Sequence, residues 1–271
     1  MAGGPPKADE KEFPYWLAAA VLIAVGLGLF IAANGLYRQV FQTVAKGIGI
    51  TLFVTTVGFL LASAMGLLLA VMGLSRSQAL RQCARFYVEI IRGVPILVLL
   101  FYIAFVGAPA FVVFWNFITS PLQSAGIAGP MGVRDFPLLW RAVIALTIGY
   151  SAFLSEVFRA GILAVDKGQV EAAKALGLSG WLRFRHVVFP QAIKTILPPL
   201  GNDFIAMVKD SSLVSVLGVA DITQMGKVYA SGSFRFFETY SIVAYIYLVM
   251  TVGLSLALRG LEKRLRRSEE R

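Results

Sequence analysis

Residues 47–75 read GIGITLFVTTVGFLLASAMGLLLAVMGLS, a run of 29 residues without a charged side chain. A helix needs about 20 mostly apolar residues to cross the hydrocarbon core of a bilayer. Five further stretches are long and apolar enough to be candidates, namely 16–33, 93–117, 138–165, 196–219 and 239–258. Turn signals at Ser120-Pro121 and Gly129-Pro130 place the end of the third near Phe117. The sequence therefore predicts an all-α integral membrane protein with six transmembrane helices.

The composition of the chain agrees with a membrane protein. Of its 271 residues, 58% are apolar and only 15% are charged, and the mean hydropathy is +0.75. Soluble domains carry roughly 25% charged residues, so a soluble enzyme and a disordered chain are both excluded. One cysteine excludes an intrachain disulfide, and one histidine excludes a metal site built from clustered histidines. The net charge of +10 is better explained by topology than by a nucleic-acid partner.

Topology follows from where the basic residues lie. If the N-terminus is inside, the inner segments 1–15, 74–92, 166–195 and 259–271 hold 17 Lys and Arg residues, and the outer segments 34–46, 118–141 and 220–238 hold 6. Cytoplasmic loops are enriched in Lys and Arg, so both termini are predicted to be cytoplasmic. The run 16–33 is long for a signal peptide and follows acidic residues, so we expect a retained helix rather than a cleaved leader.

The longest inner segment contains two short predicted helices. Residues 169–176 are rich in strong helix formers, and Gly177 stands where a helix would end. Ser179 is suited to cap a second helix running through Val188, with Pro190 closing it. Two short helices on the inner face would form a rigid docking surface, and a hairpin without a partner is the alternative.

The same segment carries a family resemblance. Glu171-Ala172-Ala173, then Gly177, then Val187-x-Phe189-Pro190 resembles the "EAA" signature of permease subunits of ATP-binding-cassette importers. Four further stretches resemble the polar amino acid branch of that family, namely 87–95, 150–162, 197–204 and 209–216. The resemblance runs from about residue 47 to 265. Val94 stands where Thr is common, and one helix precedes the five-helix core of typical members.

The resemblance implies a subunit of a type I importer in the plasma (inner) membrane of a bacterium. Its partners would be an ATPase dimer that binds ATP and Mg²⁺, a second permease that is identical or paralogous, and an extracytoplasmic protein that delivers a polar amino acid. The coupling residues would be Glu171, Ala172, Ala173, Gly177 and Pro190. Four regions follow: a tail 1–15, an added helix and external loop 16–46, a core 47–258 with the coupling loop 166–190, and a basic tail 259–271.

Several ionisable residues fall inside the predicted spans. Each costs roughly 2.5–3.5 kcal/mol at a helix centre on insertion scales, so such residues usually face protein or water. A zwitterionic substrate needs both a cationic and an anionic partner. The predicted pathway residues are Glu156, Arg159, Asn202, Lys209, Asp210 and Ser211, with Asp203 as a further charge in the fifth span. The alternative is that Glu156 and Arg159, three residues apart, pair on one helix face.

The sequence lacks the motifs of other functional classes. The sequence has no G-x-x-x-x-G-K-[ST], H-E-x-x-H or G-x-S-x-G, so ATP binding by a P-loop and two hydrolase mechanisms are not expected. We expect no cofactor in this chain and no enzymatic activity of its own, with ATP hydrolysed on a partner subunit. A secondary amino acid transporter, or another multi-pass protein without an ATPase, remains the alternative, although no internal repeat is evident.

Overall fold

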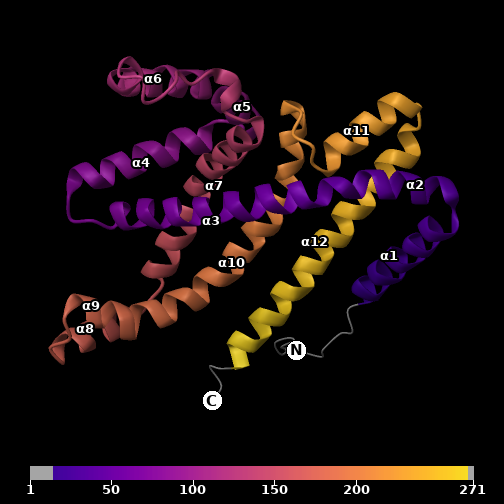
Figure 1. Cartoon of the computed structure of the whole chain (residues 1–271). Helices are drawn as coiled ribbons and strands as arrows, with labels where there is room; N and C mark the ends of the chain where they lie inside the picture. The colour runs from indigo at the N-terminus through magenta and orange to yellow at the C-terminus, as the bar shows by residue number, and fades with distance from the viewer. Residues whose placement is uncertain (1–14, 268–271) are drawn as a thin grey trace, which may run out of the picture.

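The computed structural model describes residues 15–267, and within that range the chain forms helices and turns without a strand (Figure 1). The α-helices are α1 Tyr15–Ala33, α2 Gly35–Val44, α3 Ile48–Gly73, α4 Gln78–Gly93, α5 Ile96–Tyr102, α6 Ala108–Ser124, α7 Leu138–Leu163, α8 Lys167–Ala175, α9 Gly180–Arg183, α10 Phe189–Asp210, α11 Ile222–Ser233 and α12 Phe236–Arg267. Short 3-10 turns are η1 Ala45–Gly47, η3 Val133–Asp135 and η5 Ser211–Leu217, and π turns are η2 Ile103–Gly107 and η4 Phe184–Val188. The tail 1–15 lies almost wholly outside the described residues, as do residues 268–271.

Four helical stretches are long and apolar enough to cross a membrane. They are Gly35–Gly73, Ile96–Ser124, Leu138–Leu163 and Phe236–Lys263, and Ala18–Ala33 is a shorter apolar helix. These stretches overlap most of the second, third and fourth predicted spans and contain the sixth, and α1 contains the first. The number six itself remains a prediction.

Two segments expected as loops are helical. Residues 35–44 form α2, because the Asn34 side chain caps it by accepting hydrogen bonds from the backbone N–H groups of Leu36 (3.1 Å) and Tyr37 (3.3 Å). The inner segment 74–92 is mostly α4, which packs against α3 and α7. Its charged residues recur at helical spacing and therefore share one face of α4.

The third and fifth predicted spans end differently from expectation. The third continues past Phe117 to Ser124. Pro121 has no N–H to donate to the Phe117 carbonyl, and that carbonyl instead accepts the Ser120 hydroxyl at 2.9 Å. The fifth begins at Phe189 and is an α-helix only to Asp210. Beyond it, Ser211 and Ser215 bond their hydroxyls to carbonyls three residues back, a local competition with the α-helical ladder. Asp210 is therefore the last residue of α10, although it falls near the middle of the predicted span 196–219.

The core forms where α3 and α7 pack together along their length. A Cβ on Gly66 would lie 3.0 Å from Leu154 Cβ and 3.0 Å from the Ser151 carbonyl, so glycine permits the close approach. α10 crosses α7 where Gly161 meets Ile196. At this crossing α10, which follows the α8–α9 hairpin, packs directly against the central helix α7.

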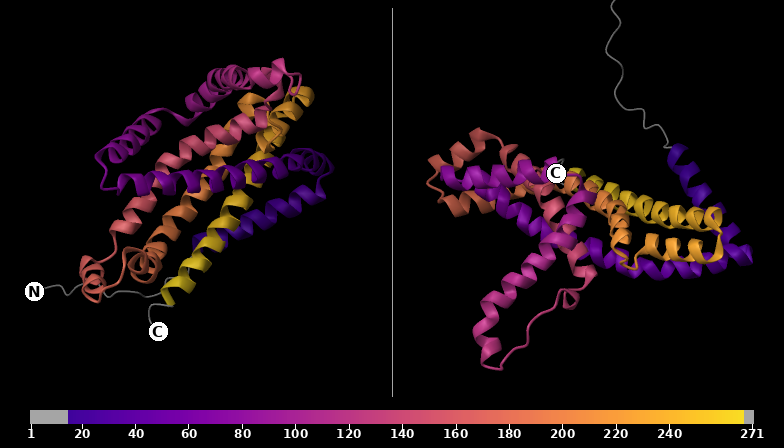
Figure 2. Two further views of the ribbon diagram at one scale, coloured as in Figure 1. Left: turned by 60° about the vertical axis from the view of Figure 1, so that its left-hand side comes forward. Right: turned by 90° about the horizontal axis from the view of Figure 1, so that it is seen from above.

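Different helices lie at the two ends of the molecule. The α8–α9 hairpin and the C-terminal end of α12 lie at one end, and α6 and α11 lie at the opposite end (Figures 1 and 2). Seen from above, α6 extends away from the other helices (Figure 2). Placing the inner hairpin and the end of α12 on the same side is consistent with the topology predicted from the basic residues.

Candidate functional site: two cavities and an exposed hairpin

Two cavities lie side by side along α7. The first, which we call the arginine-lined cavity, has a volume of about 450 Å³ and lies between α3, α4 and α7. Its charged lining residues are Arg81, Arg85, Glu89, Arg92, Glu156 and Arg159. The second, the aspartate-lined cavity, has a volume of about 500 Å³ and is bounded by α4, α5, α7 and α10. Its polar lining residues are Arg92, Tyr150, Asp203 and Asp210, so Arg92 belongs to both walls.

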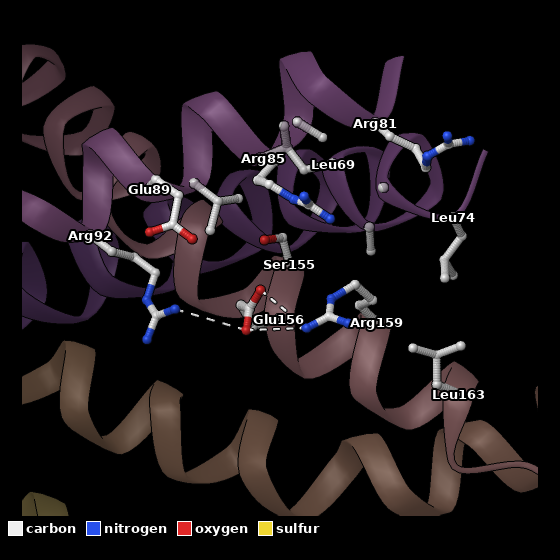
Figure 3. A pocket seen from close by; sticks show the side chains of 14 residues that line it. Leu69, Leu74, Arg81, Arg85, Glu89, Arg92, Ser155, Glu156, Arg159 and Leu163 are labelled. Atoms are coloured by element: carbon white, nitrogen blue, oxygen red, sulfur yellow. Dashed lines mark hydrogen bonds and ion pairs between the residues drawn. The ribbon is translucent and has the colours of Figure 1, made fainter. Parts of the chain in front are cut away.

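In the arginine-lined cavity, the Glu156 carboxylate forms ion pairs with two arginines. The Glu156 carboxylate lies 3.4 Å from Arg159 Nη2 and 3.8 Å from Arg92 Nη1 (Figure 3). Arg81, Arg85, Glu89 and Arg92 face this space from α4, at the spacing of one helix face (Figure 3). The side chains of Glu156, Arg92 and Arg159 are each about 42–45% exposed, so water screens the ion pairs.

The end of the arginine-lined cavity is fixed by a backbone contact. Arg81 Nη1 donates to the carbonyls of Ser75 (2.9 Å) and Arg76 (2.8 Å), which anchors the turn between α3 and α4. Arg85 carries its charge into the same cavity without such an anchor. The four arginines outnumber the two glutamates, so the cavity as a whole is basic.

In the aspartate-lined cavity, the carboxylates come from one stripe of α10. Asp203, Ala206 and Asp210 line the cavity together, since residues three, four and seven apart share a helix face. Tyr150 is 5% exposed and donates its hydroxyl to Asp210 Oδ2 at 2.7 Å. Within residues 15–267, Asp203 has no hydrogen-bond or ion-pair partner.

The shared Arg92 also contacts an aromatic ring of α7. Its guanidinium carbon lies 5.7 Å from the centre of the Phe153 ring, a cation–π contact. The apolar part of the wall comes from Ile96, Leu99 and Phe153. A small molecule in this cavity would meet a basic group, two acidic groups and an apolar surface.

The predicted pathway residues divide between these places. Glu156 and Arg159 line the arginine-lined cavity and pair with each other, so the alternative of an ion pair on one helix face is present in the structure. Asp210 lines the aspartate-lined cavity. Asn202 and Lys209 lie on an exposed face of α10 and line neither of the two cavities.

Three further residues bear on the site. Ser211 is fully buried and donates its hydroxyl to the Val208 carbonyl at 2.7 Å. The prediction did not include Arg92 and Tyr150 as site residues. Arg92 was assigned to a loop, although charges at positions 81, 85, 89 and 92 indicate a helix face. No sequence signal brings Tyr150 to Asp210, which is 60 residues away.

The inner hairpin, which we define as residues 166–190, has the predicted first helix and stop. Asp166 caps α8 by accepting the Gln169 N–H at 3.0 Å. Gly177 has φ +77°, the left-handed region, and its N–H bonds to the Lys174 carbonyl at 3.0 Å. The Leu178 N–H bonds to the Ala173 carbonyl at 3.1 Å, which completes a Schellman motif. The prediction that Gly177 ends the first helix is confirmed.

The second half of the inner hairpin corrects one prediction. Ser179 caps α9 by accepting the Leu182 N–H at 3.4 Å, as predicted. Pro190 does not close the helix, because the π turn η4 carries the chain from α9 directly into α10. A π turn also precedes Pro109 in the α5–α6 stretch, so in both places a widened turn accommodates a proline that lacks an N–H.

The surface of the inner hairpin carries exposed apolar side chains. Leu176, Trp181 and Phe189 are 82%, 65% and 50% exposed. The Phe184 ring stacks on Trp181 at a centroid distance of 6.1 Å and is tilted against Phe189 at 6.0 Å. Glu171 and Ala172 are exposed. Ala173 is 4% exposed, so it packs inward rather than toward a partner.

A side-chain hydrogen bond joins the inner hairpin to α10. Gln191 Nε2 donates to Gln169 Oε1 at 2.6 Å and to the Val187 carbonyl at 3.0 Å. Within residues 15–267, no group of three or more His, Cys, Asp or Glu side chains is close enough to hold a metal ion.

Comparison with known proteins gives consistent matches over most of the chain. The chain is 36% identical over 216 residues to the probable amino-acid permease protein YxeN of Bacillus subtilis, covering 80% of this chain and 88% of that one. It is 34% identical over 223 residues to the glutamine transport system permease protein GlnP of Escherichia coli, covering 82% and 92%. A chain in the crystal structure of an amino acid ABC transporter with histidines superposes with a TM-score of 0.69 at 39% identity, covering 84% and 95%.

The family match covers the cavities and the inner hairpin together. Residues 62–267 match the family described as binding-protein-dependent transport system inner membrane component. This range includes every lining residue of the two cavities and the whole of the inner hairpin. The chain therefore belongs to the family of inner membrane components of binding-protein-dependent transport systems.

Proposed function

We propose that this chain is the transmembrane permease subunit of an ATP-driven importer for polar amino acids. Its partners in this proposal are an ATPase dimer, a second permease, identical or paralogous, and an extracytoplasmic binding protein. The chain itself supplies no ATP site, so ATP hydrolysis takes place on the ATPase subunits. The observation that carries the proposal is the continuous helix from α9 through η4 to α10, which joins the exposed hairpin to the aspartate-lined cavity.

This helix provides a mechanism for coupling. The exposed apolar surface of the hairpin, formed by Leu176, Trp181 and Phe189, is suited to a hydrophobic groove of the ATPase, with Glu171 at its rim. When the ATPase dimer closes on ATP, it displaces the hairpin. Because the hairpin is continuous with α10 and bonded to it through Gln191, the displacement moves the stripe that carries Asp203 and Asp210. Access to the cavity changes as a result.

The cavities supply the pathway in this proposal. A zwitterionic amino acid places its ammonium near the carboxylates of α10 and its carboxylate near Arg92. It leaves past Glu156 and Arg159 on the hairpin side of α7. The exposed Asn202 and Lys209 face water between the two permeases, because a charged side chain is costly in lipid. Ser211 acts only through the end of α10 that it stabilises.

The proposed topology follows the distribution of basic residues. Six helices cross the inner membrane, both termini are cytoplasmic, and the added helix in 16–46 precedes the core 47–258, with basic tail 259–271. A reporter enzyme that is active only outside the cytoplasm tests this. Fused at Arg271 it should be silent, and fused at Gly126 it should be active. The reverse pattern contradicts the topology.

Reconstitution tests the function directly. Proteoliposomes that contain the permease, its ATPase and its binding protein should take up labelled amino acid. Uptake should require ATP on the side of the membrane where the ATPase lies. The purified chain alone should not hydrolyse ATP. Uptake that persists without the ATPase, driven by an ion gradient, would instead support a secondary transporter.

Crosslinking tests the docking surface. With the exposed Cys83 replaced by Ser, a cysteine at the exposed Ala172 should crosslink to the ATPase. A cysteine at the buried Ala173 is the matched control and should not. Glu171→Ala should weaken the complex in a salt-sensitive way, since charges at the rim act mainly on association. Equal crosslinking at both positions, or none at either, contradicts the proposed docking surface.

A further inference from the structure

The aspartate-lined cavity carries more negative than positive charge. Its wall has the two carboxylates of Asp203 and Asp210 and the single guanidinium of Arg92. The α-ammonium and α-carboxylate of a bound amino acid engage one anionic and one cationic group. One carboxylate of the wall is then left without a counter-charge. A charge that stays unpaired in a partly desolvated cavity is unfavourable, so the wall favours a ligand with one additional positive charge.

The two carboxylates are not equivalent. Asp210 already accepts the hydroxyl of the buried Tyr150 at 2.7 Å, which orients it. Asp203 has no partner within residues 15–267, and it is the group whose hydrogen-bonding capacity is entirely available to a ligand. The two residues are two helical turns apart, about 10 Å along the axis of α10. Opposite ends of one extended molecule can therefore contact them.

Apolar side chains line the cavity together with the charged groups. Ile96, Leu99 and Phe153 line the same cavity and would cover the methylene chain of a long side chain. Amphipathic basic side chains combine such a chain with a charged end. The wall thus offers three features that match an amino acid with a long cationic side chain: an apolar surface, the free carboxylate of Asp203, and the oriented carboxylate of Asp210 in the same cavity as Arg92.

The neighbouring cavity has the opposite sign. The arginine-lined cavity has four arginines against two glutamates, and its residues Glu156, Arg159 and Leu163 lie further along α7 toward the inner hairpin. A cationic ligand that moves toward the hairpin therefore passes from the acidic cavity to the basic one. The basic cavity repels it, so the ligand does not bind there a second time. A neutral ligand would experience neither effect.

From these observations we infer that the permease selects amino acids with a cationic side chain, and that Asp203 is the residue that determines this. Asp203 binds the side-chain cation, Asp210 binds the α-ammonium and Arg92 binds the α-carboxylate. The inference rests on the proposed function as an amino-acid permease. It goes beyond that function in assigning a substrate charge and a specificity-determining residue.

Binding to the permease–ATPase complex without the binding protein tests the inference, because the binding protein imposes its own selectivity. The two probes are L-arginine and L-citrulline, which differ in that a neutral urea replaces the guanidinium. Arginine should bind at least about tenfold more tightly, as expected for a charge-assisted hydrogen bond. Asp203→Asn should reduce arginine binding to the level of citrulline and leave citrulline binding unchanged.

Two further variants separate charge from folding. Asp203→Glu keeps the charge and should retain a preference for arginine. Glu238→Gln removes a carboxylate from the first turn of α12, outside both cavities, and should change neither affinity. Each variant complex is first shown by size-exclusion chromatography to assemble as the parent does.

The outcomes distinguish the inference from the proposed function. Equal binding of the two probes, or no detectable arginine binding, in a complex whose reconstituted importer takes up amino acids would overturn the charge selectivity alone. A preference for arginine that survives Asp203→Asn would likewise overturn the role given to Asp203. Failure of the reconstituted importer to take up any amino acid with ATP would overturn the proposed function and, with it, the inference.

Discussion

The helix formed by α9, η4 and α10 ends in two regions that are built in different ways. At the inner hairpin, the stabilising hydrogen bonds are local, such as those from Gly177 to Lys174 and from Leu178 to Ala173. At the aspartate-lined cavity, the decisive bond joins Asp210 to Tyr150, 60 residues away. The turn of the hairpin is therefore built by neighbouring residues, whereas the aspartate-lined cavity forms only where α10 packs on α7.

The largest effect is expected where that packing is disturbed. Gly161→Val would place a side chain against Ile196 and within 3.3 Å of the Ala192 carbonyl, at the crossing of α7 and α10. Overpacking costs about 1–3 kcal/mol or more, so the thermal stability of the purified complex should fall and uptake should be lost. Gly26→Val is the control, because no atom lies within 4 Å of a Cβ there. An unchanged melting temperature for Gly161→Val would show that the cavity does not depend on this crossing.

The second effect separates coupling from folding. Gly177→Val forces a β-branched residue to φ +77°, which costs about 1–2 kcal/mol and corresponds to a factor of about ten in an equilibrium. Membrane insertion and the cavity should be unaffected, and uptake should fail because the ATPase no longer engages the hairpin. Gly180→Ala is the matched control, with open space around it and no left-handed φ. Uptake at the normal rate in Gly177→Val would mean that the hairpin is only a surface feature.

A smaller effect is expected at the wall between the two cavities. Glu156→Gln removes the carboxylate that lies between Arg92 and Arg159. Because these side chains are almost half exposed, we expect at most about a fivefold rise in the KM of uptake, which corresponds to about 1 kcal/mol for an ion pair open to water. The rise should shrink with increasing salt. A loss of assembly instead would place Glu156 among the residues that stabilise the fold.

The smallest effect concerns the contact between the hairpin and α10. Gln191→Ala removes the donor to Gln169, and a hydrogen bond of this kind contributes about 0.5–1.5 kcal/mol. The affinity for the ATPase should fall by several-fold at most, and Gln169→Ala should have the same effect. The double variant should be no worse than either single one, since both remove one interaction. Additive losses would show that the two residues act separately.

The sequence predicted the hairpin well, because its signals are local. A run of helix formers, a glycine past the end of α8 and a serine before α9 act within a few residues of one another. Pro190 was the exception. The rule that proline ends a helix did not anticipate the π turn η4, which adds a residue just before it.

The cavities were predicted only in part, for a different reason. The shared stripe of Asp203 and Asp210 follows from helical spacing, and both were noted as charges within a span. Their partners come from α4 and α7, and single-sequence patterns do not specify which helices pack together. The charged segment 74–92 was assigned to a loop, so Arg92 was missed.

The π turn at Phe184–Val188 has a geometric consequence for the whole helix. An α-helix advances about 100° per residue, so one residue gained or lost in a turn rotates everything beyond it by that angle. A single-residue deletion here would leave the part of the hairpin before the turn, with Leu176 and Trp181, intact but would rotate the stripe of Asp203 and Asp210 away from α7 by more than a quarter of a revolution. The π turn thus sets the rotation of the charged stripe of α10 about the helix axis relative to the exposed surface of the hairpin.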